Sequence, residues 1–184
     1  QLKSLGILEN TIVLFTSDHG SHFKTRNGEY KRSLHEASIR VPTLLTGGPF
    51  TGGGSIDHLV SHVDLPPTLL DACGIAIPET FHGVSILPAL GGSDGGGQQW
   101  RDEIFVQISE SQIGRAVRTR RWKYGVTAPG SATNGTGGRE SWAARMEETF
   151  LYDLVADPYE LTNLIDVGSH RPVRDHLRQR LIAR

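Results

Sequence analysis

Residues 10–20 read Asn-Thr-Ile-Val-Leu-Phe-Thr-Ser-Asp-His-Gly. Within them, Ile12–Phe15 is a continuous β-branched and aromatic run, typical of a strand buried on both faces of a mostly parallel sheet. In open α/β sheets the chemistry lies beyond the carboxyl ends of such strands, which is where Asp18 and His19 emerge. Gly20 then lets the backbone turn sharply. A carboxylate beside an imidazole suits two ligands of one metal ion, with a simple polar turn as the alternative.

A segment rich in cations follows this stretch. Gly28–Pro42 carries Lys31, Arg32 and Arg40 and then enters a second apolar run, Val41–Leu45. Two strand ends and a basic loop are therefore expected to converge, which favours a site over an isolated turn.

The motifs formed by these residues resemble those of the type I sulfatases of the alkaline phosphatase superfamily. That family has a strand ending in Thr-Ser-Asp-Asn/His-Gly, then a lysine, then a Glu-x-x-x-Arg-Val-Pro segment that leads into the next strand. The same motifs occur here, in the same order, as Thr16–Gly20, Lys31 and Glu36–Pro42. Further matches extend the resemblance over nearly the whole chain: Val60–Asp71, Phe81–Pro88, Leu151–Leu154 and Asp157–Leu164.

The resemblance implies an α/β fold in two parts. Residues 1–92 would form the carboxyl-terminal part of the catalytic domain, with part of a mostly parallel sheet sandwiched by helices, as in alkaline phosphatase. Residues 100–184 would form a small α+β subdomain with a four-stranded antiparallel sheet and a C-terminal helix, and Gly91–Gln99 reads as the linker. Four segments are predicted to be antiparallel strands with one solvent-exposed face: Glu103–Ile108, Arg115–Thr119, Trp122–Val126 and Phe150–Leu154. The last segment, Pro172–Ile182, has the pattern of an amphipathic helix.

Several local patterns give narrower expectations. Asp64 should cap a helix that begins at Leu65-Pro66 and is closed by Gly74, with Cys73 in the core. Glu36 and Arg40 are four residues apart and should form an ion pair on one helical turn. Asp157–Glu160 reads as a turn, and His35 receives no role.

Pro129–Glu140 reads as a flexible excursion. It contains the glycosylation sequon Asn134-Gly135-Thr136.

For the site, the resemblance implies a divalent metal held by Asp18 and His19. Calcium is the usual ion of the family, whereas the histidine in place of the commoner asparagine equally suits manganese or zinc. Lys31 and His22 are predicted to be catalytic, with Lys31 stabilising charge on the sulfate.

Lys24, Arg26 and Lys31 are predicted to bind a sulfate or a sulfated sugar. The alternative is that the cations of the loop are simply solvated.

The sequence lacks other parts of the family's machinery. It contains no Cys/Ser-x-Pro-x-Arg motif, the source of the formylglycine nucleophile, because Cys73 is followed by Gly-Ile-Ala-Ile. We therefore read the chain as the carboxyl-terminal part of a sulfatase, missing the amino-terminal part of the same domain and inactive by itself. The alternatives are a phosphonate monoester or phosphodiester hydrolase of the same superfamily, or a catalytically inactive fragment.

The composition of the chain limits the classes of partner that it is expected to bind. The 184 residues include 19 Lys and Arg and 20 Asp and Glu, which gives a net charge of −1 and no electrostatic footprint for nucleic acid. No apolar run is long enough to span a bilayer. The single cysteine excludes an intrachain disulfide and leaves the compartment open between the periplasmic, secreted and lysosomal settings of the family.

Overall fold

The computed structural model describes residues 1–91, 100–110, 112–129 and 143–184. The chain forms two compact units, each built from two separate stretches of sequence. The first unit comprises Gln1–Thr16 and Pro42–Asp102, and the second comprises Ser17–Val41 and Glu103–Arg184. Most of the expected linker and most of the excursion with Asn134 lie outside the described residues.

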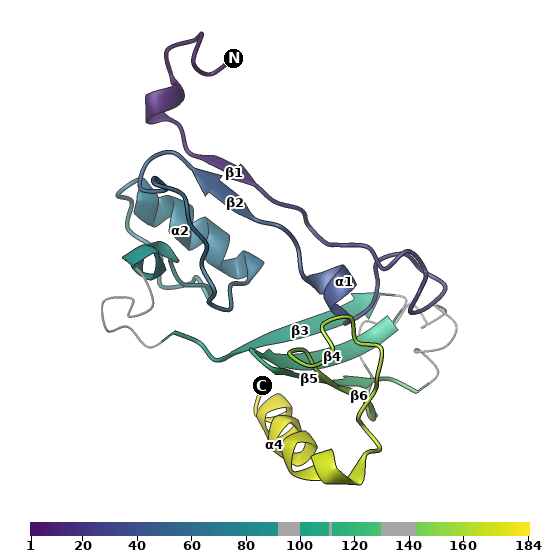
Figure 1. The fold of residues 1–184 in the computed structure, drawn as a ribbon. Coiled ribbons are helices and arrows are strands. Elements are labelled where there is room, and N and C mark those ends of the chain that lie inside the picture. Colours follow the sequence, from purple (N-terminus) through teal and green to yellow (C-terminus); the bar gives the residue numbers. More distant parts are fainter. Residues whose placement is uncertain (92–99, 111, 130–142) are drawn as a thin grey trace. The chain divides into compact units, whose positions relative to one another are not determined.

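The first unit contains a two-stranded sheet (Figure 1). After the 3-10 helix η1 (Leu8–Asn10), strand β1 (Val13–Phe15) pairs with β2 (Leu44–Thr46) in antiparallel register. Phe15 is 62% exposed, so the prediction of a strand buried in a parallel sheet was wrong for this chain. Among the described residues, no further strand joins this sheet, and β1 and β2 pair only with each other.

A helical layer completes the first unit: η2 (His62–Asp64), α2 (Leu65–Ala72) and η3 (Leu87–Gly91). Asp64 precedes α2 as predicted, but its carboxylate does not cap that helix. The buried carboxylate accepts the N–H groups of Ser61 (2.8 Å) and Val84 (2.9 Å) and pairs with the Arg101 guanidinium. Cys73 is the C-cap residue of α2 and is exposed, so its predicted place in the core was wrong.

The second unit is built on an antiparallel sheet with the order β3-β4-β5-β6. The strands and helices are β3 (Glu103–Glu110), β4 (Gln112–Thr119), β5 (Trp122–Thr127), β6 (Glu147–Asp153), α1 (Glu36–Ile39), η5 (Gly168–His170) and α4 (Arg171–Ile182). This arrangement confirms the predicted four antiparallel strands and the C-terminal helix.

Both faces of this sheet are covered, so the prediction of one wet face was wrong. Helix α4 packs on one face in a cluster of buried residues: Val117, Tyr124, Leu151, Leu177 and Leu181. The other face carries Leu34, Ala116, Phe150, Tyr152 and Leu154, of which Leu34 comes from the Ser17–Val41 stretch. A segment distant in sequence therefore supplies the second cover of the sheet. No helix in the described ranges is long and apolar enough to cross a membrane.

Gly20 lies against helix α1. Its N–H donates to the carbonyl oxygen of Ser38 at 2.8 Å. A Cβ atom on Gly20 would lie 2.1 Å from the carbonyl oxygen of Ala37, closer than any real carbon–oxygen contact. Gly20 is not in the left-handed region of φ, so the close approach to α1, rather than a sharp turn, is what requires glycine here.

The ring of His35 packs at a tilt against two aromatic rings of β6, those of Phe150 and Tyr152. Its ring centroid lies 5.4 Å from that of Phe150 and 5.7 Å from that of Tyr152. Desolvation, together with the positive charges of Arg26 and Lys123, lowers the pKa of His35 to about 3. The imidazole is therefore neutral at ordinary pH and packs as an aromatic ring.

Substituting Gly20 should displace the loop from α1. We expect Gly20→Ala to lower the free energy of unfolding by about 1–3 kcal/mol, because the new methyl group meets a backbone oxygen that cannot rotate away. Gly28→Ala is the matched control, since a Cβ atom at that position would have no neighbour within 4 Å. Urea unfolding of both variants measures the difference, and an equal effect of the two substitutions would contradict this packing.

The neutral His35 should make stability depend on pH. The pKa is about 3 in the folded chain and near 6.5 in the unfolded chain, so between these values only the unfolded chain binds the proton. As the pH falls from about 6.5, His35 should therefore reduce the free energy of unfolding by about 1.4 kcal/mol per pH unit. We expect His35→Phe to flatten this slope in urea titrations from pH 7 to 4. The exposed-site control His82→Gln should not flatten it.

Candidate functional site

Three residues predicted for the site lie close together in the second unit: Asp18, His19 and Lys31. The Lys31 Nζ atom lies 2.9 Å from Nε2 of His19. The Oδ2 atom of Asp18 lies 3.4 Å from the same nitrogen. An ammonium, an imidazole and a carboxylate therefore lie close together in the loop between β1 and α1.

The hydrogen bonds of His19 define its tautomer. An ammonium can only donate, so Nε2 of His19 accepts from Lys31 and carries no proton. The proton then lies on Nδ1, which donates to the carbonyl oxygen of Gly20 at 2.7 Å. The single Nε2 lone pair is therefore directed at the Lys31 ammonium, and a metal ion could bind it only in place of this hydrogen bond.

Asp18 is the exposed member of this group, with its side chain 82% exposed. Although desolvation acts to raise its pKa, the net shift is downward, because His19 in its protonated form, the backbone N–H groups and Lys31 favour the carboxylate. One of these N–H groups, that of His19, donates to Oδ1 at 3.0 Å. Asp18 is therefore a charged oxygen ligand available to a cation from solvent.

A divalent cation fits this donor pair. A carboxylate oxygen and an unprotonated imidazole nitrogen 3.4 Å apart can both bind one ion, since metal–ligand distances are about 2.0–2.6 Å. In the described part of the chain, no group of three or more His, Cys, Asp or Glu residues surrounds a common point. Asp18 and His19 could therefore offer two ligand atoms to an ion, which is not a complete coordination shell.

His22 is buried, with 2% of its surface exposed. Among the described residues, neither ring nitrogen has a hydrogen-bond partner. Desolvation lowers the pKa of His22, and Arg26 acts in the same direction. The ring is therefore a neutral imidazole with unused hydrogen-bonding capacity.

The two loop cations predicted to bind substrate differ in their surroundings. Lys24 is exposed, and its backbone is left-handed with φ of 63°. Arg26, in contrast, donates from Nη1 to the carbonyl oxygen of Glu160 (2.8 Å) and from Nη2 to that of Tyr159 (2.6 Å). Lys24 is thus free to meet solvent, whereas Arg26 ties the loop to the turn after β6.

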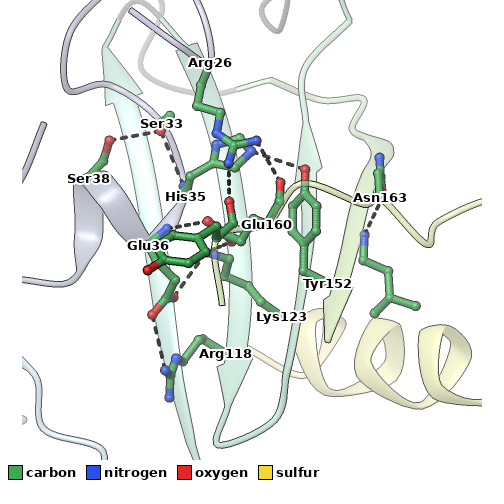
Figure 2. Close-up of polar contacts among 12 residues, drawn as sticks. Arg26, Ser33, His35, Glu36, Ser38, Arg118, Lys123, Tyr152, Glu160 and Asn163 are labelled. Atoms are coloured by element: carbon green, nitrogen blue, oxygen red, sulfur yellow. Dashed lines mark hydrogen bonds and ion pairs between the residues drawn. The ribbon is translucent and has the colours of Figure 1, made fainter. Parts of the chain in front are cut away.

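A buried group of charges that the sequence did not predict lies beside this loop (Figure 2). Lys123 on β5 is 0% exposed and forms ion pairs with Glu36 and with Glu160. Glu36 also pairs with Arg118 at 3.2 Å. Burial opposes the charge on Glu36, but Lys123 and Arg118 bring a net decrease in its pKa.

This group replaces the ion pair expected between Glu36 and Arg40. Glu36 has its partners on β4 and β5, so the spacing of four residues misidentified its neighbour. Glu160, which the sequence placed in a simple turn, is 2% exposed and lies in this group. The one signal in the sequence was Lys123 between Trp122 and Tyr124, a charge inside an otherwise aromatic strand.

Comparison with known proteins places these features in a family. A family model described as "N-sulphoglucosamine sulphohydrolase, C-terminal" matches residues 28–184. Mouse arylsulfatase K is 33% identical over 170 residues, which cover 89% of this chain and 28% of the relative. An arylsulfatase from Clostridium perfringens is 31% identical, over 98% of this chain and 35% of the relative. The chain therefore spans about a third or less of these relatives.

Solved structures give the same fold. A 2-O GAG sulfatase has a TM-score of 0.75 and 26% identity, covering 95% of this chain and 36% of that one. A protein in complex with its substrate D-glucosamine-2-N,6-O-disulfate has a TM-score of 0.75 at 23% identity, covering 99% and 35% of the two chains. The phosphonate monoester hydrolase of Silicibacter pomeroyi also has a TM-score of 0.75, at 20% identity, covering 99% and 36%. The latter two likenesses concern the fold alone. Because the family model matches most of its length, this chain belongs to the N-sulphoglucosamine sulphohydrolase C-terminal family of sulfatases.

Proposed function

We propose that this chain is part of a sulfuric ester hydrolase and contributes one side of its sulfate site. The observation that carries the proposal is the meeting of the Lys31 ammonium, the His19 lone pair and the Asp18 carboxylate at one point. The names of the relatives, arylsulfatases from mouse and from Clostridium perfringens, support the same reaction.

In this proposal Asp18 and His19 hold a divalent cation, with Ca²⁺ as the first candidate and Mn²⁺ or Zn²⁺ as alternatives. The bound ion would neutralise sulfate oxygens as a Lewis acid. The Nδ1–H bond from His19 to Gly20 keeps Nε2 unprotonated, and the negative charge of Asp18 favours a cation at this position.

Lys31 would serve as the fixed cation of the site. An ammonium is a compact point charge that suits an anionic oxygen, and charge that is already in place costs little rearrangement when the transition state forms. We propose that Lys24 adds a second, mobile charge for an anionic substrate. Arg26 is engaged by two backbone carbonyls, so we propose an anchoring role for it in place of substrate binding. His22 remains a proposed catalytic residue that would act through a neutral ring.

The substrate class that we propose is a sulfated carbohydrate. The family description refers to N-sulphoglucosamine, and one structural relative is described as a 2-O GAG sulfatase. The nucleophile would be a formylglycine supplied from outside this chain, since the sequence has no Cys/Ser-x-Pro-x-Arg motif. We therefore expect the 184-residue chain by itself to show no turnover.

Lys31 gives the direct test of this function. In the full-length protein that contains this sequence, Lys31→Ala should lower kcat/KM for a sulfate ester by about 10²–10³-fold, the usual effect of removing one preorganised charge. The matched control Lys3→Ala, at an exposed position of the first unit, should retain activity.

The assay would use an aryl sulfate, N-sulfated glucosamine and a phosphonate monoester in parallel. Faster hydrolysis of the phosphonate monoester than of both sulfates would replace the proposed reaction with that of the related hydrolases. Full activity of Lys31→Ala would remove Lys31 from the site.

The metal ligands can be tested without turnover. We expect Mn²⁺ to broaden the NMR signals of the His19 ring at lower concentration than those of exposed His82, because the Asp18 carboxylate adds a second ligand. Asp18→Asn should raise the Mn²⁺ concentration needed for this broadening by about tenfold, whereas the exposed-site control Asp71→Asn should not change it. Equal broadening in all three proteins would count against a metal at Asp18 and His19.

A further inference from the structure

We propose that Glu160, on the turn after β6, is a positioning residue that holds the loop bearing Asp18, His19 and Lys31. The catalytic meaning of this role rests on the proposed function, whereas the geometry stands independently of it. Glu160 touches none of the three site residues and acts on them through helix α1 and Arg26.

The Glu160 side chain holds the first residue of α1. Its carboxylate is 2% exposed, and Oε2 accepts the backbone N–H of Glu36 at 2.7 Å. The other oxygen, Oε1, pairs with the ammonium of Lys123 (Figure 2). A buried carboxylate thus fixes the start of α1 to strand β5 with a charge-assisted hydrogen bond and an ion pair.

The backbone of the same turn holds the other part of the loop. Arg26, which lies between His19 and Lys31 in sequence, donates to the carbonyl oxygens of Tyr159 and Glu160. Glu160 has a left-handed backbone with φ of 56°, an uncommon conformation for a residue other than glycine. One turn therefore binds the loop both before Lys31, through Arg26, and after it, through Glu36.

A short series of hydrogen bonds connects α1 to the site. The Ser38 carbonyl of α1 accepts the N–H of Gly20 at 2.8 Å. The Gly20 carbonyl in turn accepts the Nδ1–H of His19 at 2.7 Å. Because this last bond sets the tautomer of His19, the position of α1 bears on which ring nitrogen faces Asp18 and Lys31.

Loss of the Glu160 charge should therefore change the surroundings of the His19 ring. Lys123 is 0% exposed and pairs with the carboxylates of Glu36 and Glu160. Without the charge of Glu160, only the carboxylate of Glu36 remains of these two partners. Removal of one member of a buried ionic group leaves an uncompensated buried charge and is strongly destabilising. Glutamine has one acceptor oxygen in place of two, so its NH2 group would face either the Glu36 N–H or the Lys123 ammonium, and one of these two contacts is lost. We therefore expect helix α1 and its loop to move.

The test compares Glu160→Gln with Glu103→Gln in the 184-residue chain. Glu103 is also a buried carboxylate of the second unit, but it pairs with Arg180 and Arg184 of the C-terminal region. We expect both variants to lower the unfolding midpoint. Only Glu160→Gln should speed hydrogen exchange of the Gly20 amide, by at least about tenfold relative to the slowest amides of β4 and β5. Only this variant should also shift the ring ¹⁵N signals of His19 away from the Nδ1–H tautomer.

The result that would overturn the proposal is an unchanged Gly20 exchange rate and His19 ring in Glu160→Gln, or equal changes in the two variants. If Glu160→Gln does not fold, the double variant Lys123→Met with Glu160→Gln removes both charges and allows the same two measurements. Neither measurement depends on turnover. A failure of the sulfatase proposal would therefore appear as missing sulfate hydrolysis by the full-length protein, with the exchange and tautomer results of the 184-residue chain intact.

Discussion

The burial of one ammonium group organises the second unit. Lys123 projects from the middle of a sheet and is 0% exposed, a position that an isolated positive charge cannot occupy without a large desolvation cost. The compensating carboxylates belong to Glu36 and Glu160, which come from different segments. Satisfying this single charge therefore brings a strand, a short helix and a turn to the same place. Buried ion pairs are weak sources of net free energy, because the cost of desolvation offsets the attraction between the charges.

The sheet itself has two different covers. Helix α4 packs on one face through Leu177 and Leu181 and forms an ordinary apolar layer. The opposite face is covered by Leu34 and by the neutral ring of His35, with the ionic group at its side. The loop that carries the candidate site belongs to this second cover, so it packs directly on the strands of the sheet.

The sequence predicted the parts of this structure that depend on local periodicity. Alternation in segments such as Glu103–Ile108 identified the strands, and the amphipathic pattern after Pro172 identified α4. The composition of Ile12–Phe15 could not report the exposure of Phe15, because a buried strand and an uncovered one have the same composition. The partners of Glu36 were missed for a related reason: spacing along a helix reports only neighbours on that helix.

For the candidate site, the sequence could name the side chains that meet near His19, because they follow one strand end and one basic loop. It could not supply the tautomer or the anchoring of Arg26. Both depend on backbone carbonyls, which leave no mark in the identity of the residue that offers them. The requirement for Gly20 was visible in the sequence, but its cause, the backbone of α1, was not.

The division of the second unit into two stretches has a consequence for the time at which the site forms. Glu36 precedes Lys123 by 87 positions and Glu160 by 124 positions. During synthesis, Asp18, His19 and Lys31 therefore leave the ribosome long before the residues that order their loop, and contacts so distant in sequence form late and slowly. Until the turn after β6 has been made, the loop has no scaffold, and a ribosome that stalls before that point releases a chain with the site residues present but unarranged.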